Sequence, residues 1–294
     1  MEHEEGAISR AKASLTFSML VFGTIGIFVR YISLPSSVIA MVRGIIGTVF
    51  LLIVIFKRGP GIAWQDIRRN LFYLCLSGAF IGINWILLFE SYHYTTVATA
   101  TLCYYMAPVF VTIAAPIVFK ERLTQKKVFC ISVALAGMIL VSGVWNVNIT
   151  GNGELRGIFY GIGAAVFYAS VILLNKKIRD ISPYDKTMMQ LATASIVLLP
   201  YTFLTENLSV MILTPQTLLM LAVVGILHTG ISYMLYFGSM KYLEAQTIAI
   251  FSFIDPIVAI LLSALFLKEP LGIAEIVGAI MVLGAAFISE LSEK

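Results

Sequence analysis

Three ionisable side chains, Arg43, His228 and Asp255, lie inside long apolar stretches of this sequence of 294 residues. Asp255 is about twelve residues from the end of its stretch, which is roughly 18 Å along a helix. An ionisable group at such a depth in a membrane is costly and is by default a functional candidate. Pro256 frees a carbonyl group near Ser252, so Asp255 and that carbonyl could bind an ammonium group or a proton. Alternatively, Asp255 is protonated or capped and stabilises a broken helix.

Arg43 and His228 each allow a binding role and a structural one. Arg43 is about six residues into its stretch, roughly 10 Å deep, where its forked donors suit a carboxylate. It could equally pair with Glu90, or extend its charged end to the membrane surface. The aligned residue in the second half is close to Gln190. His228 would be the pH-sensitive group of a binding site, or a histidine bonded to a neighbouring hydroxyl.

The composition shows which solvent surrounds these residues. Apolar types make up 59% of the chain and charged types 12%, whereas a soluble domain is about 25% charged. Such a chain cannot cover a folded surface with polar groups. We therefore expect an integral membrane protein of the all-α class, not a cytosolic enzyme.

The apolar stretches predict ten transmembrane helices, each long enough to cross about 30 Å of hydrocarbon. The expected spans are Ala11–Tyr31, Ser37–Phe56, Asn70–Ser91, Val97–Phe119, Val128–Trp145, Gly157–Asn175, Asp185–Leu204, Thr217–Met240, Ala245–Leu267 and Gly272–Ser289.

The positive charges predict the orientation. With a cytoplasmic N-terminus, 16 of the 20 Lys and Arg residues lie inside, three (Arg30, Arg156 and Lys268) lie outside, and Arg43 lies within a span. Short loops rich in Lys and Arg stay in the cytoplasm. We expect both termini to be cytoplasmic and the protein to lie in a bacterial plasma membrane. The net charge of +4 reports topology and gives no reason to expect nucleic acid as a partner.

The sequence contains an internal repeat. A shift of 148 residues aligns 82–123 with 230–271 without a gap, and 11 of the 42 positions are identical. The matches include Pro108 with Pro256, and the pair Lys120-Glu121 with Lys268-Glu269. Each copy holds five spans, an odd number, so the copies enter the membrane in opposite directions. The sequence therefore predicts a polytopic protein with two inverted five-helix repeats, 11–145 and 157–289, an architecture typical of transporters.

The repeat also aligns polar and aromatic residues within spans. Asn84 and Trp85 match Ser232 and Tyr233, and Tyr104 matches Ser252. Tyr168 adds an aromatic group from the sixth span. Such groups suit an amphipathic ligand, although a tyrosine in a span is often a packing or interface residue. The full set of candidate substrate-binding residues is Arg43, Asn84, Trp85, Tyr104, Tyr168, Gln190, His228, Tyr233, Ser252 and Asp255.

The stretches Tyr92–Val141 and Lys241–Phe287 resemble the two EamA domains of the drug/metabolite transporter superfamily. The shared features are the proline in the fourth span, the Glu121-Arg122-Leu123 or Glu269-Pro270-Leu271 turn, and a fifth span of small residues. The resemblance covers essentially the whole chain. It implies ten spans, cytoplasmic termini and movement of small metabolites, often amino acids.

We expect a secondary active exporter of amino acids or related amphipathic compounds, working by alternating access, with proton movement as a candidate coupling. A metabolite importer is the alternative of the same fold, and an intramembrane enzyme using Asp255 and His228 is the alternative of another class. The sequence lacks a phosphate-binding loop, a serine nucleophile elbow and histidines at zinc spacing. The expected partners are thus a small solute and the bilayer, with no cofactor, no metal and no catalytic residue.

Overall fold

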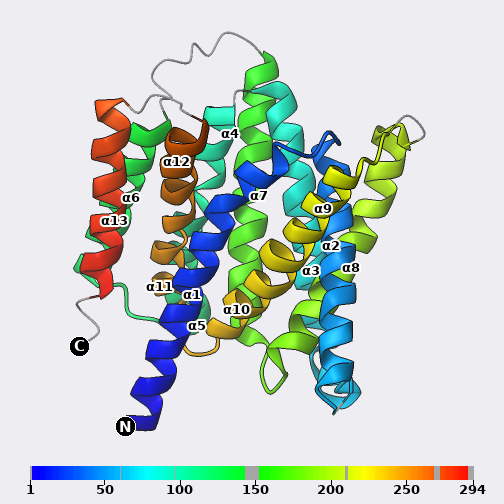
Figure 1. Ribbon diagram of the computed structural model, residues 1–294. Helices are drawn as coiled ribbons and strands as arrows, with labels where there is room; N and C mark the ends of the chain where they lie inside the picture. Colours follow the sequence, from blue (N-terminus) through cyan, green and yellow to red (C-terminus); the bar gives the residue numbers. More distant parts are fainter. Residues whose placement is uncertain are drawn as a thin grey trace. The chain divides into compact units, whose positions relative to one another are not determined.

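The computed structural model describes residues 2–59, 61–95, 97–142, 152–208, 211–267 and 272–290. Within these ranges all regular structure is helical and no strand occurs, which confirms the all-α class (Figure 1). The helices are α1 (Glu2–Val29), α2 (Ser36–Lys57), α3 (Trp64–Tyr94), α4 (Val97–Tyr104), α5 (Ala107–Phe119), α6 (Gln125–Ser142), α7 (Asn152–Lys177), α8 (Pro183–Thr205), α9 (Pro215–Val223), the π-helix η3 (Val224–Ile231), α10 (Ser232–Ser239), α11 (Ala245–Phe251), α12 (Ile254–Leu267) and α13 (Ile273–Glu290).

Many of these helices present apolar side chains outward. Leu204 is 86% exposed and Ile273 is 82% exposed, which is favourable only where the surrounding solvent is itself apolar. In the described residues, seven helical segments are long and apolar enough to cross a membrane. The chain is an integral membrane protein. The number of ten crossings and their inverted arrangement stay predictions, and Lys268 and Glu269 lie outside the described residues.

The chain divides into two compact units. Unit 1 comprises 1–86 and 174–243. Within it α2 packs on α8 and on η3, and α1 packs on α10. The segment from α9 through η3 to α10, yellow in Figure 1, is one continuous helical path whose middle turns are π-helical.

Helix starts in unit 1 follow a simple sequence rule. Ser182 and Thr214 each precede a proline, and their side chains accept a hydrogen bond from the backbone N–H of Tyr184 and Thr217. A hydroxyl at the N-cap satisfies a backbone donor that the helix itself cannot. Proline in the first turn needs no such partner. These two caps fix where α8 and α9 begin.

Unit 2 comprises 87–173 and 244–294. Here α6, green in Figure 1, lies along α13, red, and α5 packs on α11. The core between them includes Met138, Ile250, Phe253 and Val282. The fourth and ninth predicted spans are both interrupted, because α4 is followed by α5 and α11 by α12 after a break of two residues.

The glutamate of the Glu121-Arg122-Leu123 turn has a specific structural role in unit 2. Lys120 ends α5 in the left-handed conformation, with φ of 58°. The Glu121 carboxylate then accepts hydrogen bonds from the backbone N–H groups of Ala245 (3.0 Å) and Gln246 (3.5 Å). A carboxylate at these donors also complements the helix dipole. The turn between α5 and α6 is thus fastened to the start of α11.

Glycines mark close helix contacts. A Cβ atom built at Gly78 or Gly82 of α3 would lie 2.6 Å or 3.0 Å from a backbone oxygen of α8. In unit 2, a Cβ at Gly161 of α7 would lie 2.8 Å from the Cβ of Cys103 in α4. Small residues let helix backbones approach each other in this way.

Candidate functional site

The two interrupted spans of unit 2 break at matching points of the repeat. Between α4 and α5 the chain leaves the helix at Tyr105, and between α11 and α12 it does so at Ser252 and Phe253. A shift of 148 residues brings the two breaks together within a residue. Pro108 and Pro256 lie in the first turn of the following helices, where the backbone N–H groups have no partner within the helix and a missing one costs little. Such discontinuous helices in corresponding positions are a hallmark of transporter binding sites.

Asp255 lies in the first turn of α12 and contacts the break between α4 and α5. Its carboxylate accepts a hydrogen bond from the hydroxyl of Tyr105. The rings of Tyr105 and Phe253, which are equivalent residues of the repeat, have centroids 6.4 Å apart. The two breaks are therefore in contact, with the carboxylate of Asp255 held between them.

Aromatic rings extend this cluster. Tyr104 stacks on Tyr168 of α7, with ring centroids 5.4 Å apart and planes 29° apart, and it also contacts Tyr105. Asp255 and these three tyrosines are partly buried, so each retains some accessible surface. Ser252 differs, because it is 4% exposed and its hydroxyl donates to the Ile248 carbonyl of its own helix at 2.9 Å. The cluster formed by Tyr104, Tyr105, Tyr168 and Asp255 is called the break cluster below.

A second group of predicted residues meets in unit 1. The guanidinium carbon of Arg43 lies 4.2 Å above the ring of Trp85, a cation–π geometry. Trp85 in turn contacts Tyr233 edge to face, with centroids 6.2 Å apart. Trp85 and Tyr233 are again equivalent residues of the repeat. Glu90, in unit 2, has its Oε2 atom 3.8 Å from Nδ1 of His93.

His228 lies in η3 and is bonded to a hydroxyl. Its Nε2 atom is 2.8 Å from the hydroxyl oxygen of Thr24, and that hydroxyl also donates to the Val21 carbonyl at 2.7 Å. The Thr24 hydroxyl therefore lies between the ring of His228 and the backbone of α1. The ring also packs on Phe28. This contact fits the structural alternative for His228, and a role in binding stays a prediction.

Gln190 belongs to a buried polar network in unit 1 instead of an open site. It is fully buried, and its amide nitrogen donates to the Ser77 hydroxyl (2.8 Å) and to Oδ1 of Asn175 (3.1 Å). Lys186, 5% exposed, donates to the backbone carbonyls of Phe237 (3.0 Å) and Asn175 (3.4 Å). Both carbonyls are near the C-terminal ends of their helices, where the helix dipole favours a cation. The network ties α3, α7, α8 and α10 together.

The predicted residues are thus divided between the two units, and in unit 1 only Arg43, Trp85 and Tyr233 are joined by the ring contacts described above. Asn84, Trp85, Gln190, His228 and Ser252 are each less than 5% exposed, while the others are partly buried. The expectation that Asn84 shares a cavity with Tyr104, Tyr168 and Asp255 stays a prediction, because Asn84 lies in unit 1 and the others in unit 2.

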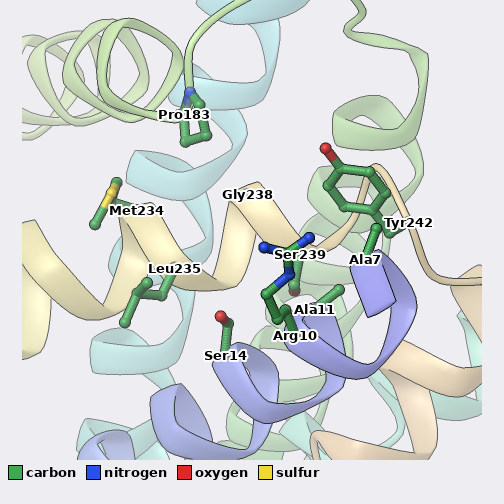
Figure 2. A pocket seen from close by; sticks show the side chains of 10 residues that line it. All are labelled: Ala7, Arg10, Ala11, Ser14, Pro183, Met234, Leu235, Gly238, Ser239 and Tyr242. Carbon is green, nitrogen blue, oxygen red and sulfur yellow. The ribbon is translucent and has the colours of Figure 1, made fainter. Parts of the chain in front are cut away.

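Two cavities of unit 1 have other linings. One, of about 240 Å³, is lined by residues of α1 and α10, by Pro183 at the start of α8 and by Tyr242, which follows α10 (Figure 2). The other, of about 710 Å³, is lined by Glu206, Gln216 and hydroxyl-bearing residues near the ends of α8 and α9. Neither lining includes a residue from the predicted set. Among the described residues, no group of three His, Cys, Asp or Glu side chains could hold a metal ion.

Sequence reasoning missed Tyr105 and Lys186. Tyr105 aligns with Phe253, so the repeat presented it as a packing residue, although it directly follows Tyr104 and lies at the break. Lys186 was expected at the cytoplasmic end of a span and counted toward orientation. Its burial depends on carbonyl groups of α7 and α10, which leave no pattern in the neighbouring sequence.

The family follows from comparison with known proteins. Residues 13–143 and 155–290 match the model of the EamA-like transporter family. This chain belongs to that family. The EamA-like relatives include "Uncharacterized transporter YxxF" of Bacillus subtilis, 31% identical over 274 residues that cover 93% of this chain and 87% of the relative. Another, "Uncharacterized transporter" of Archaeoglobus fulgidus, is 27% identical over 95% of both chains.

A solved crystal structure shares the fold of this EamA-like chain. It aligns with a TM-score of 0.83 over 96% of this chain and 98% of the other, at 18% sequence identity. This likeness concerns the fold and not the solute. Taken with the family match, the chain is a membrane transporter of the drug/metabolite transporter type. The names of its relatives point to a protein that is not an enzyme.

Proposed function

We propose that this EamA-like protein is a secondary active exporter of amino acids or related amphipathic compounds. The observation that carries the proposal is the contact between the two helix breaks, with the Asp255 carboxylate held by Tyr105. A carboxylate at a break suits a solute ammonium group or a proton. The faces of Tyr104 and Tyr168 suit the apolar part of an amphipathic solute.

The packing of equivalent helices supports two inverted repeats, 11–145 and 157–289. Under the shift of 148 residues α2 corresponds to α8 and α6 to α13, and each of these two pairs is in contact. Elements related by a two-fold axis meet their own equivalents along that axis. The family model also matches the chain twice, over 13–143 and 155–290. Alternating access, in which inverted repeats exchange conformations, is the mechanism that this architecture favours.

The proposed orientation has both termini in the cytoplasm, as the Lys and Arg distribution requires. Proton coupling through Asp255 is part of the proposal, because a carboxylate deep in a span can carry either a proton or a cationic solute. We assign to Arg43 the binding of a solute carboxylate, because the donors of its guanidinium match the two oxygens of a carboxylate. Import instead of export is the alternative direction, since the gradients set the direction of flux.

The test is solute flux in proteoliposomes. Purified protein is reconstituted and loaded with a mixture of labelled amino acids, and the contents and the medium are analysed for both movement and chemical identity. The proposal expects exchange of unmodified solute that depends on the protein. Conversion of the solute without flux would instead establish the intramembrane enzyme, and flux of other metabolite classes with no amino acid flux would contradict the proposed substrate class.

Replacing Tyr105 by Phe is expected to slow flux about 3- to 10-fold, because it removes the hydrogen bond to Asp255 while keeping the ring. Such bonds to a charged group contribute about 1.5–3 kcal/mol, and the carboxylate recovers part of this from the solute. The matched control is Tyr94→Phe, in a tyrosine of unit 2 that contacts Tyr160 outside the break cluster. Initial rates in proteoliposomes measure both. Equal rates for the Tyr105 variant and the wild-type protein would contradict a role for this hydroxyl.

A further inference from the structure

Unit 1 has a cavity of about 240 Å³ at the N-terminal part of α1. Its lining comes from α1 (Arg10 and Ser14), from α10 (Met234 and Leu235), from Pro183 at the start of α8, and from Tyr242. Figure 2 shows the Arg10 side chain reaching from α1 toward Gly238 and Ser239 of α10, with the ring of Tyr242 beside it. The cavity therefore combines one fixed positive charge with mostly apolar walls.

Arg10 is placed to bind an anion in this cavity. Its Nε atom donates to the Gly6 carbonyl at 3.0 Å, which holds the stem of the side chain along the helix. A guanidinium has five donors, and that bond uses one. The two terminal nitrogens carry the other four, in the forked arrangement that matches a phosphate or carboxylate group.

Further cations lie around the cavity wall. Nζ of Lys241 is 5.7 Å from the ring centroid of Tyr242, and Nζ of Lys176 donates to the carbonyl of Leu243, the next residue, at 2.7 Å. On the other side, the guanidinium of Arg58 lies 4.4 Å above the ring of Tyr184, which follows Pro183. None of these three cations lines the cavity, but each contacts a lining residue or the residue next to one, so they add positive charge near Arg10.

The helix surface above the cavity is apolar. Arg10, Ser14 and Phe17 occupy positions i, i+4 and i+7 of α1 and therefore share one face. Phe17 is 47% exposed. The face thus changes from charged to hydroxyl-bearing to apolar within two turns, which is the order of groups in a membrane lipid from headgroup to acyl chain.

We infer that this cavity binds the headgroup phosphate of an anionic phospholipid in the cytoplasmic leaflet. Basic pockets between helices on the cytoplasmic side recognise anionic headgroups in this way. Arg10 binds the phosphate, the hydroxyl of Tyr242 adds a donor, and the acyl chain passes along Phe17. The cavity is lined by no residue of the break cluster, so lipid binding can be tested separately from solute transport.

The inference is tested on the full-length protein in detergent with fluorescent phosphatidylglycerol as the probe. Three proteins are compared: wild type, Arg10→Ala, and Arg69→Ala as the matched control. Arg69 is an exposed arginine of α3 that does not line the cavity. Both substituted residues are exposed, so their thermal unfolding midpoints should equal that of the wild type.

We expect the dissociation constant for phosphatidylglycerol to rise about tenfold or more in Arg10→Ala, as for the loss of a charge-assisted hydrogen bond. It should change less than twofold in Arg69→Ala. Equal losses in both variants would show a diffuse charge effect and overturn the site. Equal affinity for phosphatidylcholine would overturn the choice of an anionic lipid, and displacement of the probe by excess inorganic phosphate would show a site for soluble anions instead.

Discussion

Replacing Asp255 by Asn is expected to lower amino acid flux about 10- to 100-fold while the protein stays folded. The amide keeps the size of the side chain and can still accept the hydrogen bond from Tyr105. It loses the negative charge that binds an ammonium group or carries a proton. Hydrogen bonds to charged groups contribute about 1.5–3 kcal/mol, and 1.4 kcal/mol is a factor of ten. Initial rates of labelled solute in proteoliposomes measure the change.

The matched control for this variant is Asp66→Asn. Asp66 is an acidic residue in the first turn of α3, belongs to unit 1 and is not part of the break cluster. Flux by this variant should stay within about twofold of the wild type, because Asp66 is partly exposed and a solvated charge contributes little. Size-exclusion profiles and thermal unfolding show whether each variant is folded. If Asp255→Asn transports at the wild-type rate with an unchanged pH dependence, Asp255 serves only to stabilise the broken helix.

Replacing Gly78 by Ala is expected to destabilise the protein by about 1–3 kcal/mol, the usual cost of overpacking a well-packed contact. The new Cβ would lie 2.6 Å from both the backbone oxygen of Gln190 and the Cβ of Thr193. A backbone oxygen cannot rotate away, so α3 and α8 must separate. Because Gln190 also bonds to Ser77 of α3, the separation strains the buried network as well. The thermal unfolding midpoint in detergent should fall.

Gly26→Ala makes the same chemical change in an open position of the same unit. A Cβ at Gly26 of α1 has no atom within 4 Å. Alanine favours a helix over glycine by about 0.5–1 kcal/mol, so this variant should be as stable as the wild type or slightly more stable. Gly78→Ala is therefore expected to lower the thermal unfolding midpoint, and Gly26→Ala to leave it unchanged or raise it slightly. A Gly78→Ala midpoint that equals that of Gly26→Ala would show that α3 and α8 do not pack closely at this position.

The helical class and the close helix contacts were predictable from local sequence. Composition alone required a lipid solvent, and two glycines four residues apart, as at Gly78 and Gly82, are a local signal for the close approach that the structure shows. Both signals are local, because hydropathy and residue size act wherever a residue lies. The repeat likewise identified Pro108 and Pro256 as equivalent, and the structure has a helix break before each.

The partners of the candidate residues were less predictable. Trp85 and Tyr233 were aligned by the repeat, but alignment alone does not say that their rings touch. The hydrogen bond from Tyr105 to Asp255 joins residues 150 positions apart in the sequence. Gln190 and Arg43 occupy similar places in the two copies, yet one lies in a buried amide network and the other over an aromatic ring. Such differences depend on what faces each side chain, which a single sequence does not contain.

The π-helix η3 changes which side chains of its span point in the same direction. On a helical wheel of an ideal α-helix, residues five apart point about 140° away from each other. With i→i+5 bonding there are roughly 4.4 residues per turn, so each π-helical step turns the chain by about 80° instead of about 100°, and the angle becomes smaller. His228 and Tyr233 are five apart, and both meet α1, through Thr24 and Phe22. The wider turn of η3 therefore lets His228 and Tyr233 both point toward α1. In an uninterrupted α-helix, one of these two side chains would point away from α1.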